Sequence, residues 1–177
     1  MIAGNAGIMV SEVIYEKKTP AKNFLIIDGA MNDLMRPALY DARHTIIPAK
    51  EPQNNETHLV DIVGPVCEST DIFAKNQHLP RMFAGDLIVF RSAGDYGAVM
   101  SNTYNTRLLI PEVLVKGHDF AIIRERDRVH ARAELCGNQT RAALIKTSDL
   151  AGQNARPIEI SLSVKRHIVR PINTLGW

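Results

Sequence analysis

Short runs of apolar and β-branched residues, each closed by a turn signal, occupy most of this chain. Runs of this length and composition are typical of strands. Between the last two runs, Lys116 to Asp119 is typical of a hairpin turn. Helical tendencies are confined to residues 33–39 and to the stretch after Gly94. The pattern predicts an all-β fold, a barrel or sandwich with a few short helices. The runs cover residues 8–15, 24–28, 44–47, 59–63, 86–91, 112–115 and 120–123.

The pattern changes near residue 127. Residues 127–148 are rich in Ala, Arg and small polar residues and have poor periodicity, whereas residues 157–164 alternate like one amphipathic strand. We therefore expect a β domain over 1–126 and a loosely attached C-terminal extension over 127–177. We expect part of this extension to be disordered, and its sequence indicates no chemistry.

Charge and cysteine content narrow the class of protein. The 177 residues carry a formal net charge of +2 with both signs interspersed, which gives no electrostatic footprint for nucleic acid or a membrane surface. Cys67 and Cys136 lie far apart in unlike contexts, which favours a reducing cytoplasm over a disulfide framework. The N-terminus does not resemble a secretory signal, and no apolar run reaches the ~18 residues of a membrane-spanning helix. We expect a cytoplasmic protein that acts on a small molecule.

A thiol and a carboxylate stand side by side at Cys67 and Glu68, just after the apolar run 59–63 and a Gly-Pro turn signal. A turn at the end of a buried strand is held rigidly by the sheet while its side chains point away from it. A thiol donates a proton or acts as a nucleophile, and a carboxylate binds an ammonium group. The alternative is a buried, inert Cys beside a solvated Glu.

Two further segments carry groups that suit a small anionic ligand. Arg36 and Tyr40 lie four residues apart, which on a helical turn places a guanidinium and a phenol on one face, ready for a carboxylate. Tyr96 lies among small residues that allow close backbone approach to a ligand such as a phosphate. Alternatively, Arg36 pairs with Asp33 or Asp41, and the two tyrosines pack in the core.

Several motifs in one order give the chain a family resemblance over residues 2–126. Together these motifs resemble the diaminopimelate decarboxylase family, pyridoxal phosphate enzymes built from an alanine-racemase-like barrel and a β domain. The motifs are Gly4-Asn5-Ala6-Gly7, Asp28 to Leu34 with Arg36 to Tyr40, Gly64 to Ser69, Ala74-Lys75, Gly85-Asp86, Ser92-Ala93-Gly94 with Tyr96-Gly97, Tyr104-Asn105 and Glu112 to Val115.

The resemblance implies roles for five residues. Family members decarboxylate meso-2,6-diaminopimelate to L-lysine, so Arg36 and Tyr40 correspond to ligands of the substrate carboxylate. Cys67 corresponds to the catalytic proton donor and Glu68 to a substrate-binding acid. Tyr96 corresponds to a contact with both substrate and cofactor. In the family, Cys and Glu complete the site of the partner subunit of a dimer. No metal is implied.

The family's barrel carries the lysine that holds the cofactor, and no lysine of this chain lies in a matching motif. The resemblance therefore indicates the C-terminal part of such a decarboxylase, a carboxy-lyase that needs pyridoxal 5'-phosphate. We expect the lone chain to be inactive without a barrel domain, from a barrel-bearing partner chain or a homodimer. The alternatives are a non-catalytic dimerisation or regulatory β domain and, less well supported, a related ornithine- or arginine-type decarboxylase.

Overall fold

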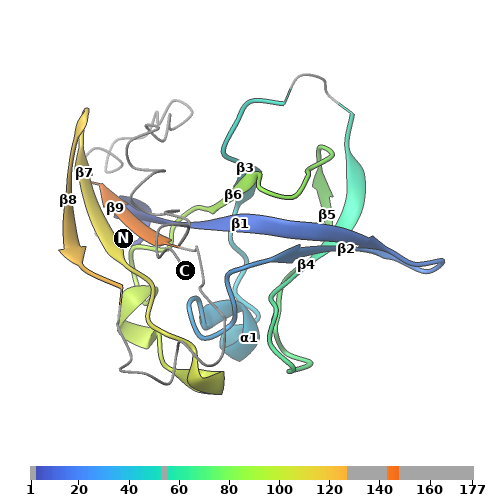
Figure 1. Ribbon diagram of the computed structural model, residues 1–177, viewed down its shortest axis with the longest axis horizontal. Coiled ribbons are helices and arrows are strands. Elements are labelled where there is room, and N and C mark those ends of the chain that lie inside the picture. The colour runs from blue at the N-terminus through green and yellow to red at the C-terminus, as the bar shows by residue number, and fades with distance from the viewer. Residues whose placement is uncertain (1–2, 53–55, 127–142, 148–177) are drawn as a thin grey trace, which may run out of the picture.

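Six strands follow one another around a nearly closed barrel (Figure 1). The computed structural model describes residues 3–52, 56–126 and 143–147. Around the barrel the order is β3-β6-β1-β2-β4-β5, and every pairing is antiparallel except the parallel pair β2–β4. The strands are β1 (Gly7–Lys18), β2 (Asn23–Ile27), β3 (Ile46–Pro48), β4 (His58–Val63), β5 (Ile72–Leu79) and β6 (Leu87–Phe90).

Three further strands extend the sheet from β1, in the order β1-β9-β7-β8. They are β7 (Glu112–Lys116), β8 (Asp119–Arg124) and β9 (Ala143–Thr147). β9 pairs antiparallel with β1 and parallel with β7, while β7 and β8 form the hairpin expected from their sequence. The helices are single turns: η1 (Gly4–Ala6), α1 (Arg36–Tyr40), η2 (Ala98–Met100) and η3 (Tyr104–Thr106).

The first half of β1 is buried on both faces, which explains why its sequence alternates only loosely. Successive side chains on a strand point to opposite faces. Met9 and Val13 therefore face the barrel interior, whereas Ile8 and Val10 pack on the other side against Val113 of the β7–β8 hairpin. A strand between two apolar layers has no solvated face and needs no polar alternation.

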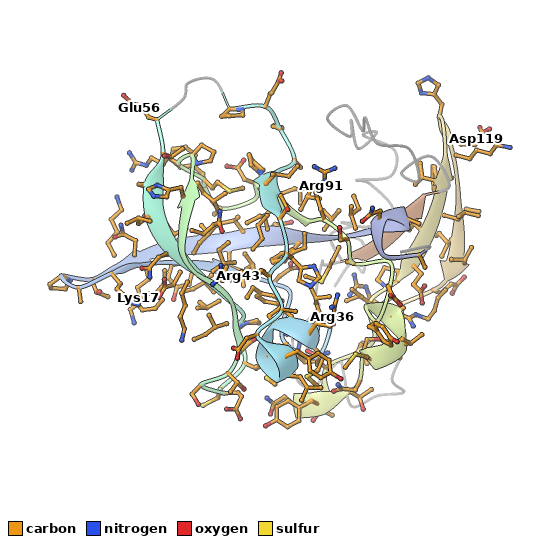
Figure 2. The ribbon with its side chains drawn as sticks, turned by 180° about the vertical axis from the view of Figure 1, so that it is seen from behind. Lys17, Arg36, Arg43, Glu56, Arg91 and Asp119 are labelled. Carbon is orange, nitrogen blue, oxygen red and sulfur yellow. The ribbon has the colours of Figure 1, made fainter. Side chains whose placement is uncertain are left out.

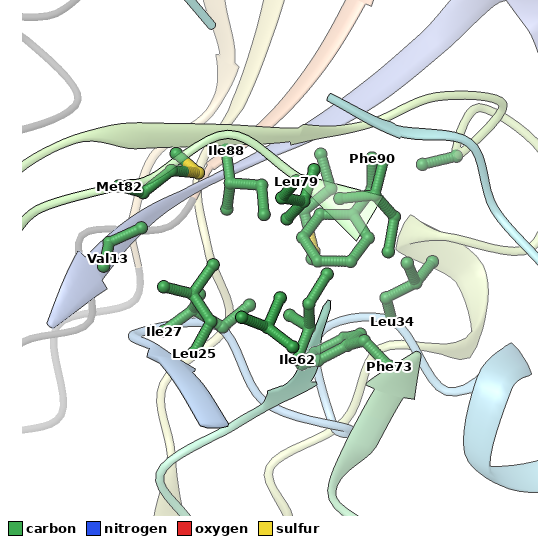
Figure 3. Close-up of a cluster of buried hydrophobic side chains, with 14 of the residues drawn as sticks. Val13, Leu25, Ile27, Leu34, Ile62, Phe73, Leu79, Met82, Ile88 and Phe90 are labelled. Atoms are coloured by element: carbon green, nitrogen blue, oxygen red, sulfur yellow. The ribbon is translucent and has the colours of Figure 1, made fainter. Parts of the chain in front are cut away.

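The barrel interior is a single apolar cluster that draws on nearly every strand (Figure 3). Phe90 on β6 and Phe73 on β5 meet inside it with ring centroids 4.9 Å apart. Because β5 and β6 are not hydrogen-bonded to each other, this aromatic contact links them through the barrel interior. The loops that leave the strands are therefore carried on a rigid frame.

The predicted all-β barrel with short helices is confirmed. The sequence pattern did not predict β5, whose centre, Lys75 to His78, is polar, or β9. The strand expected at 157–164 lies outside the described residues. The division into 1–126 and 127–177 stays a prediction, and β9 is the part of the second range that the structure describes. Within the described residues, no helix is long and apolar enough to cross a membrane.

Candidate functional site

Three connecting segments meet at one end of the barrel, below β1 in Figure 1. They are residues 28–42, which include α1, the β4–β5 turn of residues 64–71, and residues 91–107 with η2 and η3. The Met31 N–H donates to Asp71 Oδ1 at 2.7 Å, which ties the first segment to the second. The Asn102 N–H donates to the Asn32 carbonyl at 3.0 Å, which ties the third segment to the first. All five predicted site residues lie on these segments.

Asp71 shapes the turn that carries the thiol. Its Oδ2 accepts the Val66 N–H at 2.9 Å while its Oδ1 holds Met31, so one carboxylate fixes both segments. Burial raises the pKa of Asp71, although the two N–H donors oppose that shift. A Cβ on Gly64 would overlap the Asp71 carboxylate, so this turn requires glycine at position 64.

Cys67 and Glu68 lie on the outer side of this turn, where ligands have access to them. The Cys67 thiol is free and exposed, so the alternative of a buried, inert cysteine is wrong. Glu68 Oε1 accepts the Thr70 N–H at 3.4 Å, and Oε2 accepts the Tyr104 hydroxyl at 3.2 Å. The Thr70 N–H first, and then the Tyr104 hydroxyl, lower the pKa of Glu68. The carboxylate is therefore ionised and available to a cation.

Arg36 and Tyr40 open and close α1, so the helical turn places them on the same face, as the spacing predicted. The helix begins at Arg36 rather than at Asp33, and Pro37 is tolerated in its first turn. Arg36 stands on α1 in Figure 2, and its guanidinium makes no hydrogen bond or ion pair within the described part of the chain. Tyr40 is 61 % exposed, so it does not pack in the core. Asp33 pairs with a different arginine.

A histidine near Arg36 adds to this region. The His44 ring interacts through Nδ1 with the Arg91 carbonyl at 3.0 Å. Burial lowers the pKa of His44, and the charge of Arg36 adds to that effect. His44 is therefore neutral near neutral pH, so Arg36 is the charged group of this pair.

Tyr96 is 54 % exposed, so the alternative that it lies in the core is wrong as well. Its backbone φ of 58° lies in the left-handed region, which bulky side chains rarely adopt. Gly94 precedes it, and a Cβ there would overlap the Ala3 carbonyl and the Gly7 amide nitrogen. The segment is thus packed against the start of β1 while its tyrosine points outward.

A buried charge network that the sequence pattern did not predict lies beneath these loops. Arg107 Nη2 donates to the Asp28 carbonyl at 2.6 Å and approaches Asp33 Oδ2 at 3.4 Å. The Asp28 carboxylate accepts the Ser11 hydroxyl at 2.7 Å. Burial raises the pKa of Asp33 to about 6 against the opposing effect of Arg107. The network anchors two of the loops to β1.

The predicted site residues share one end of the barrel, but polar contacts do not link Arg36, Tyr40 and Tyr96 to the turn of Cys67 and Glu68. Within the described ranges, no hydrogen bond or ion pair joins Arg36, Tyr40 or Tyr96 to Cys67 or Glu68. Tyr104 is the site residue that carried no predicted role, although it lies in a family motif. A tyrosine hydroxyl in an exposed loop is the sequence signal that could have identified it.

Few groups of this site have the chemistry that pyridoxal phosphate requires. The exposed Tyr96 ring offers a surface for stacking. The adjoining Asp95 carries a carboxylate, which disfavours a phosphate at that position. The ammonium group of Lys22 is engaged in an ion pair with Asp61 at 2.8 Å, so Lys22 is not a free lysine. These residues do not form the cofactor's phosphate and lysine site. Within the described part of the chain, no group of three His, Cys, Asp or Glu side chains is arranged to hold a metal.

Comparison with known proteins gives consistent matches. Residues 1–94 match the family described as pyridoxal-dependent decarboxylase, C-terminal sheet domain. Diaminopimelate decarboxylase of Zymomonas mobilis is 48% identical over 128 residues, which are 72% of this chain and 30% of that protein. The chain thus spans about a third of the length of the curated relatives it matches.

Solved structures agree with this match. The Helicobacter pylori diaminopimelate decarboxylase, solved in complex with L-lysine, superposes with a TM-score of 0.67 at 37% identity. The match covers 76% of this chain and 33% of that one. A Vibrio vulnificus lysine/ornithine decarboxylase complexed with cadaverine superposes with a TM-score of 0.53 at 25% identity, over 59% of this chain and 28% of that one.

Proposed function

The chain belongs to the pyridoxal-dependent decarboxylases, whose C-terminal sheet domain it contains, and we propose that it serves the decarboxylation of meso-2,6-diaminopimelate to L-lysine. The observation that carries the proposal is the exposed Cys67 thiol beside an ionised Glu68, on a turn that Asp71 fixes to the segment leading into α1. The sheet domain contributes these groups to a site completed by a barrel-bearing chain or segment.

Substrate binding falls to groups of opposite charge. Arg36 binds a substrate carboxylate through its planar guanidinium, and Tyr40, on the same face of α1, donates its hydroxyl to that carboxylate. Glu68 binds an ammonium group of the substrate. A diamino dicarboxylic acid carries both kinds of group at each end, so it suits a site with separate cationic and anionic ligands.

Cys67 supplies the proton. Bound pyridoxal phosphate provides the electron sink that allows a carboxylate to leave as carbon dioxide. The C–C bond breaks, its electron pair stays on the substrate, and the thiol proton is transferred to that carbon. The thiolate then takes a proton from water. A donor fixed on one face of the substrate gives one stereochemical outcome. In a homodimer, Cys67 and Glu68 act in the site of the neighbouring subunit.

The test is a hybrid enzyme in which this full chain replaces the matching C-terminal part of the Zymomonas mobilis relative. With pyridoxal phosphate and meso-diaminopimelate, we expect it to form L-lysine and carbon dioxide. Cys67→Ala should reduce kcat at least about a hundredfold, the usual contribution of a positioned general acid. Cys136→Ala, which changes the chain's other cysteine, should leave turnover unchanged.

Three outcomes would contradict the proposal. The first is a folded, cofactor-loaded hybrid that makes no lysine, which would favour a non-catalytic dimerisation or regulatory role. The second is a hybrid in which Cys67→Ala costs nothing. The third is a preference for L-ornithine or L-arginine over meso-diaminopimelate, which would favour the ornithine- or arginine-type reaction.

A further inference from the structure

Tyr104 reaches from the 91–107 segment to the turn that carries Cys67, and its hydroxyl donates to Glu68 Oε2 at 3.2 Å. We infer that Tyr104 is a positioning residue that holds the Glu68 carboxylate in the orientation that receives the substrate's ammonium group. The inference rests on the proposed function, because it concerns the residue that orients its substrate-binding acid.

Hydrogen bonds hold the backbone on both sides of Tyr104. The Tyr104 N–H donates to Asn102 Oδ1 at 2.9 Å. Asn102 is in turn fixed to buried Asn32 in both directions, since its N–H donates to the Asn32 carbonyl and its carbonyl accepts the Asn32 side-chain amide, each at 3.0 Å. The start of the loop is therefore anchored on the segment that leads into α1.

The other side of Tyr104 is anchored as firmly. Asn105 and Thr106 have φ angles of 56° and 58°, a conformation costly for β-branched Thr106. The Arg107 N–H donates to the Tyr104 carbonyl at 3.3 Å, and its buried side chain binds the Asp28 carbonyl and Asp33. Two consecutive left-handed residues persist only where the surroundings impose them. Here they turn the chain so that the ring faces Glu68.

The two carboxylate oxygens of Glu68 accept hydrogen bonds from different segments. Ser69 and Thr70, from its own turn, donate to Oε1, while Tyr104 donates to Oε2. Without Tyr104, the carboxylate would be held through Oε1 alone, by bonds of 3.3 and 3.4 Å from its own turn. The charged group nearest on the turn is Asp71, whose like charge repels an ionised Glu68. The Tyr104 donor favours the charged form of the carboxylate against this repulsion and holds its Oε2 atom. An ammonium group is the ligand that such an acceptor selects.

The first test uses the full chain and needs no catalysis. The carboxyl of Glu68 is titrated by carbon NMR in the unmodified chain and in Tyr104→Phe, which removes only the hydroxyl. We expect the pKa of Glu68 to rise in this variant. Tyr15→Phe, at a half-exposed tyrosine on β1, is the matched control and should leave the titration unchanged. An unchanged titration in Tyr104→Phe overturns the inference.

The second test uses the hybrid enzyme. Tyr104→Phe should raise the KM for meso-diaminopimelate about fivefold with a smaller change in kcat, because an exposed hydrogen bond to a charged group exerts only part of its full strength. The acidic limb of the kcat/KM profile should move to higher pH. If Tyr104→Phe leaves the KM and the pH profile of an active hybrid unchanged, the role of Tyr104 is overturned while the proposed function stands. A folded hybrid without activity overturns the proposed function, and the titration still decides whether Tyr104 controls Glu68.

Discussion

At the scale of single residues, Asp33 is the most perturbed carboxyl group near the site. Its side chain is buried, its Oδ2 accepts the Ala30 N–H at 2.9 Å, and Arg107 lies at 3.4 Å. Burial nevertheless raises its pKa from 3.8 to about 6. The pKa of Asp33 is higher in the folded chain than in the unfolded chain. The contribution of its protonated carboxyl to stability is therefore fully present below the unfolded pKa. It is lost as the pH rises through the folded pKa.

Asp33→Asn tests this linkage. The unmodified chain should lose about 3 kcal/mol of unfolding free energy relative to Asp33→Asn between about pH 4 and pH 7, because each pKa unit is worth about 1.4 kcal/mol. Urea unfolding of both proteins at several pH values measures the difference, in which the other titrating groups cancel. A difference that is constant over this range, or that grows in the opposite direction, would contradict the assignment.

The sequence predicted the pair of Cys67 and Glu68 but not the contacts made by Asp71 and Arg107. Cys67 and Glu68 are neighbours in sequence, so their pairing was visible without a structure. Asp71 and Met31 are 40 positions apart, and Arg107 and Asp33 are 74 apart. No local pattern reports such partners, because the chain fold alone brings them together.

At the scale of elements, β5 and β6 are linked by side chains and not by backbone hydrogen bonds. The aromatic pair of Phe73 and Phe90 joins them inside the core, and Phe90 is fully buried. By contrast, Phe83 lies in the loop before β6, is 61 % exposed, and contacts Arg81 on the surface. The same residue type therefore stands in two opposite environments close together in sequence.

Phe90→Ala should lower the free energy of unfolding by roughly 3–5 kcal/mol, through lost apolar contact and the cavity left in the core. Phe83→Ala, the matched control, should change it by at most about 1 kcal/mol, since surface substitutions cost little. Chemical denaturation of both variants measures the contrast. Equal effects for the two would mean that the Phe73–Phe90 contact does not hold the barrel together.

β5 was missed in the sequence because its pattern is interrupted. Apolar residues lie at its two ends, at Ile72, Phe73 and Leu79, and polar residues fill its centre. The register shifts opposite its middle, and Asn76 adopts a φ of 51° while its N–H donates to Asp61. This irregularity breaks the period of two that identifies a strand. The regular runs of β4 and β7 were found without difficulty.

At the scale of the whole molecule, Arg107 connects the site loops to the barrel. It lies 8 % exposed beneath them and binds the segment after β2, while its own segment carries Tyr104. Because the loops have little regular structure, their mutual placement depends on such buried polar ties. Loss of this side chain should therefore affect the loops and the global stability together.

Arg107→Met should reduce the free energy of unfolding by roughly 3–5 kcal/mol, the range for removing one partner of a buried pair. Hydrogen exchange at the Asn102 amide should become faster, because its loop loses an anchor. Arg91→Met serves as the control. Arg91 is exposed, and it contacts His44 through its backbone carbonyl, which the substitution keeps. Unchanged exchange in Arg107→Met would show that the loops are held by other contacts.

The sequence by itself determined the strand-rich fold, the turn that carries Cys67 and Glu68, and the shared helical face of Arg36 and Tyr40. Each of these features depends on local periodicity or on residues that are neighbours in the sequence. Only the tertiary structure decided that β1 is buried on both faces and that Asp71 ties two loops. It also decided that Tyr104 meets Glu68, 36 positions away. Such contacts depend on where the barrel places its loops, and the energy of burying and pairing distant groups fixes that placement.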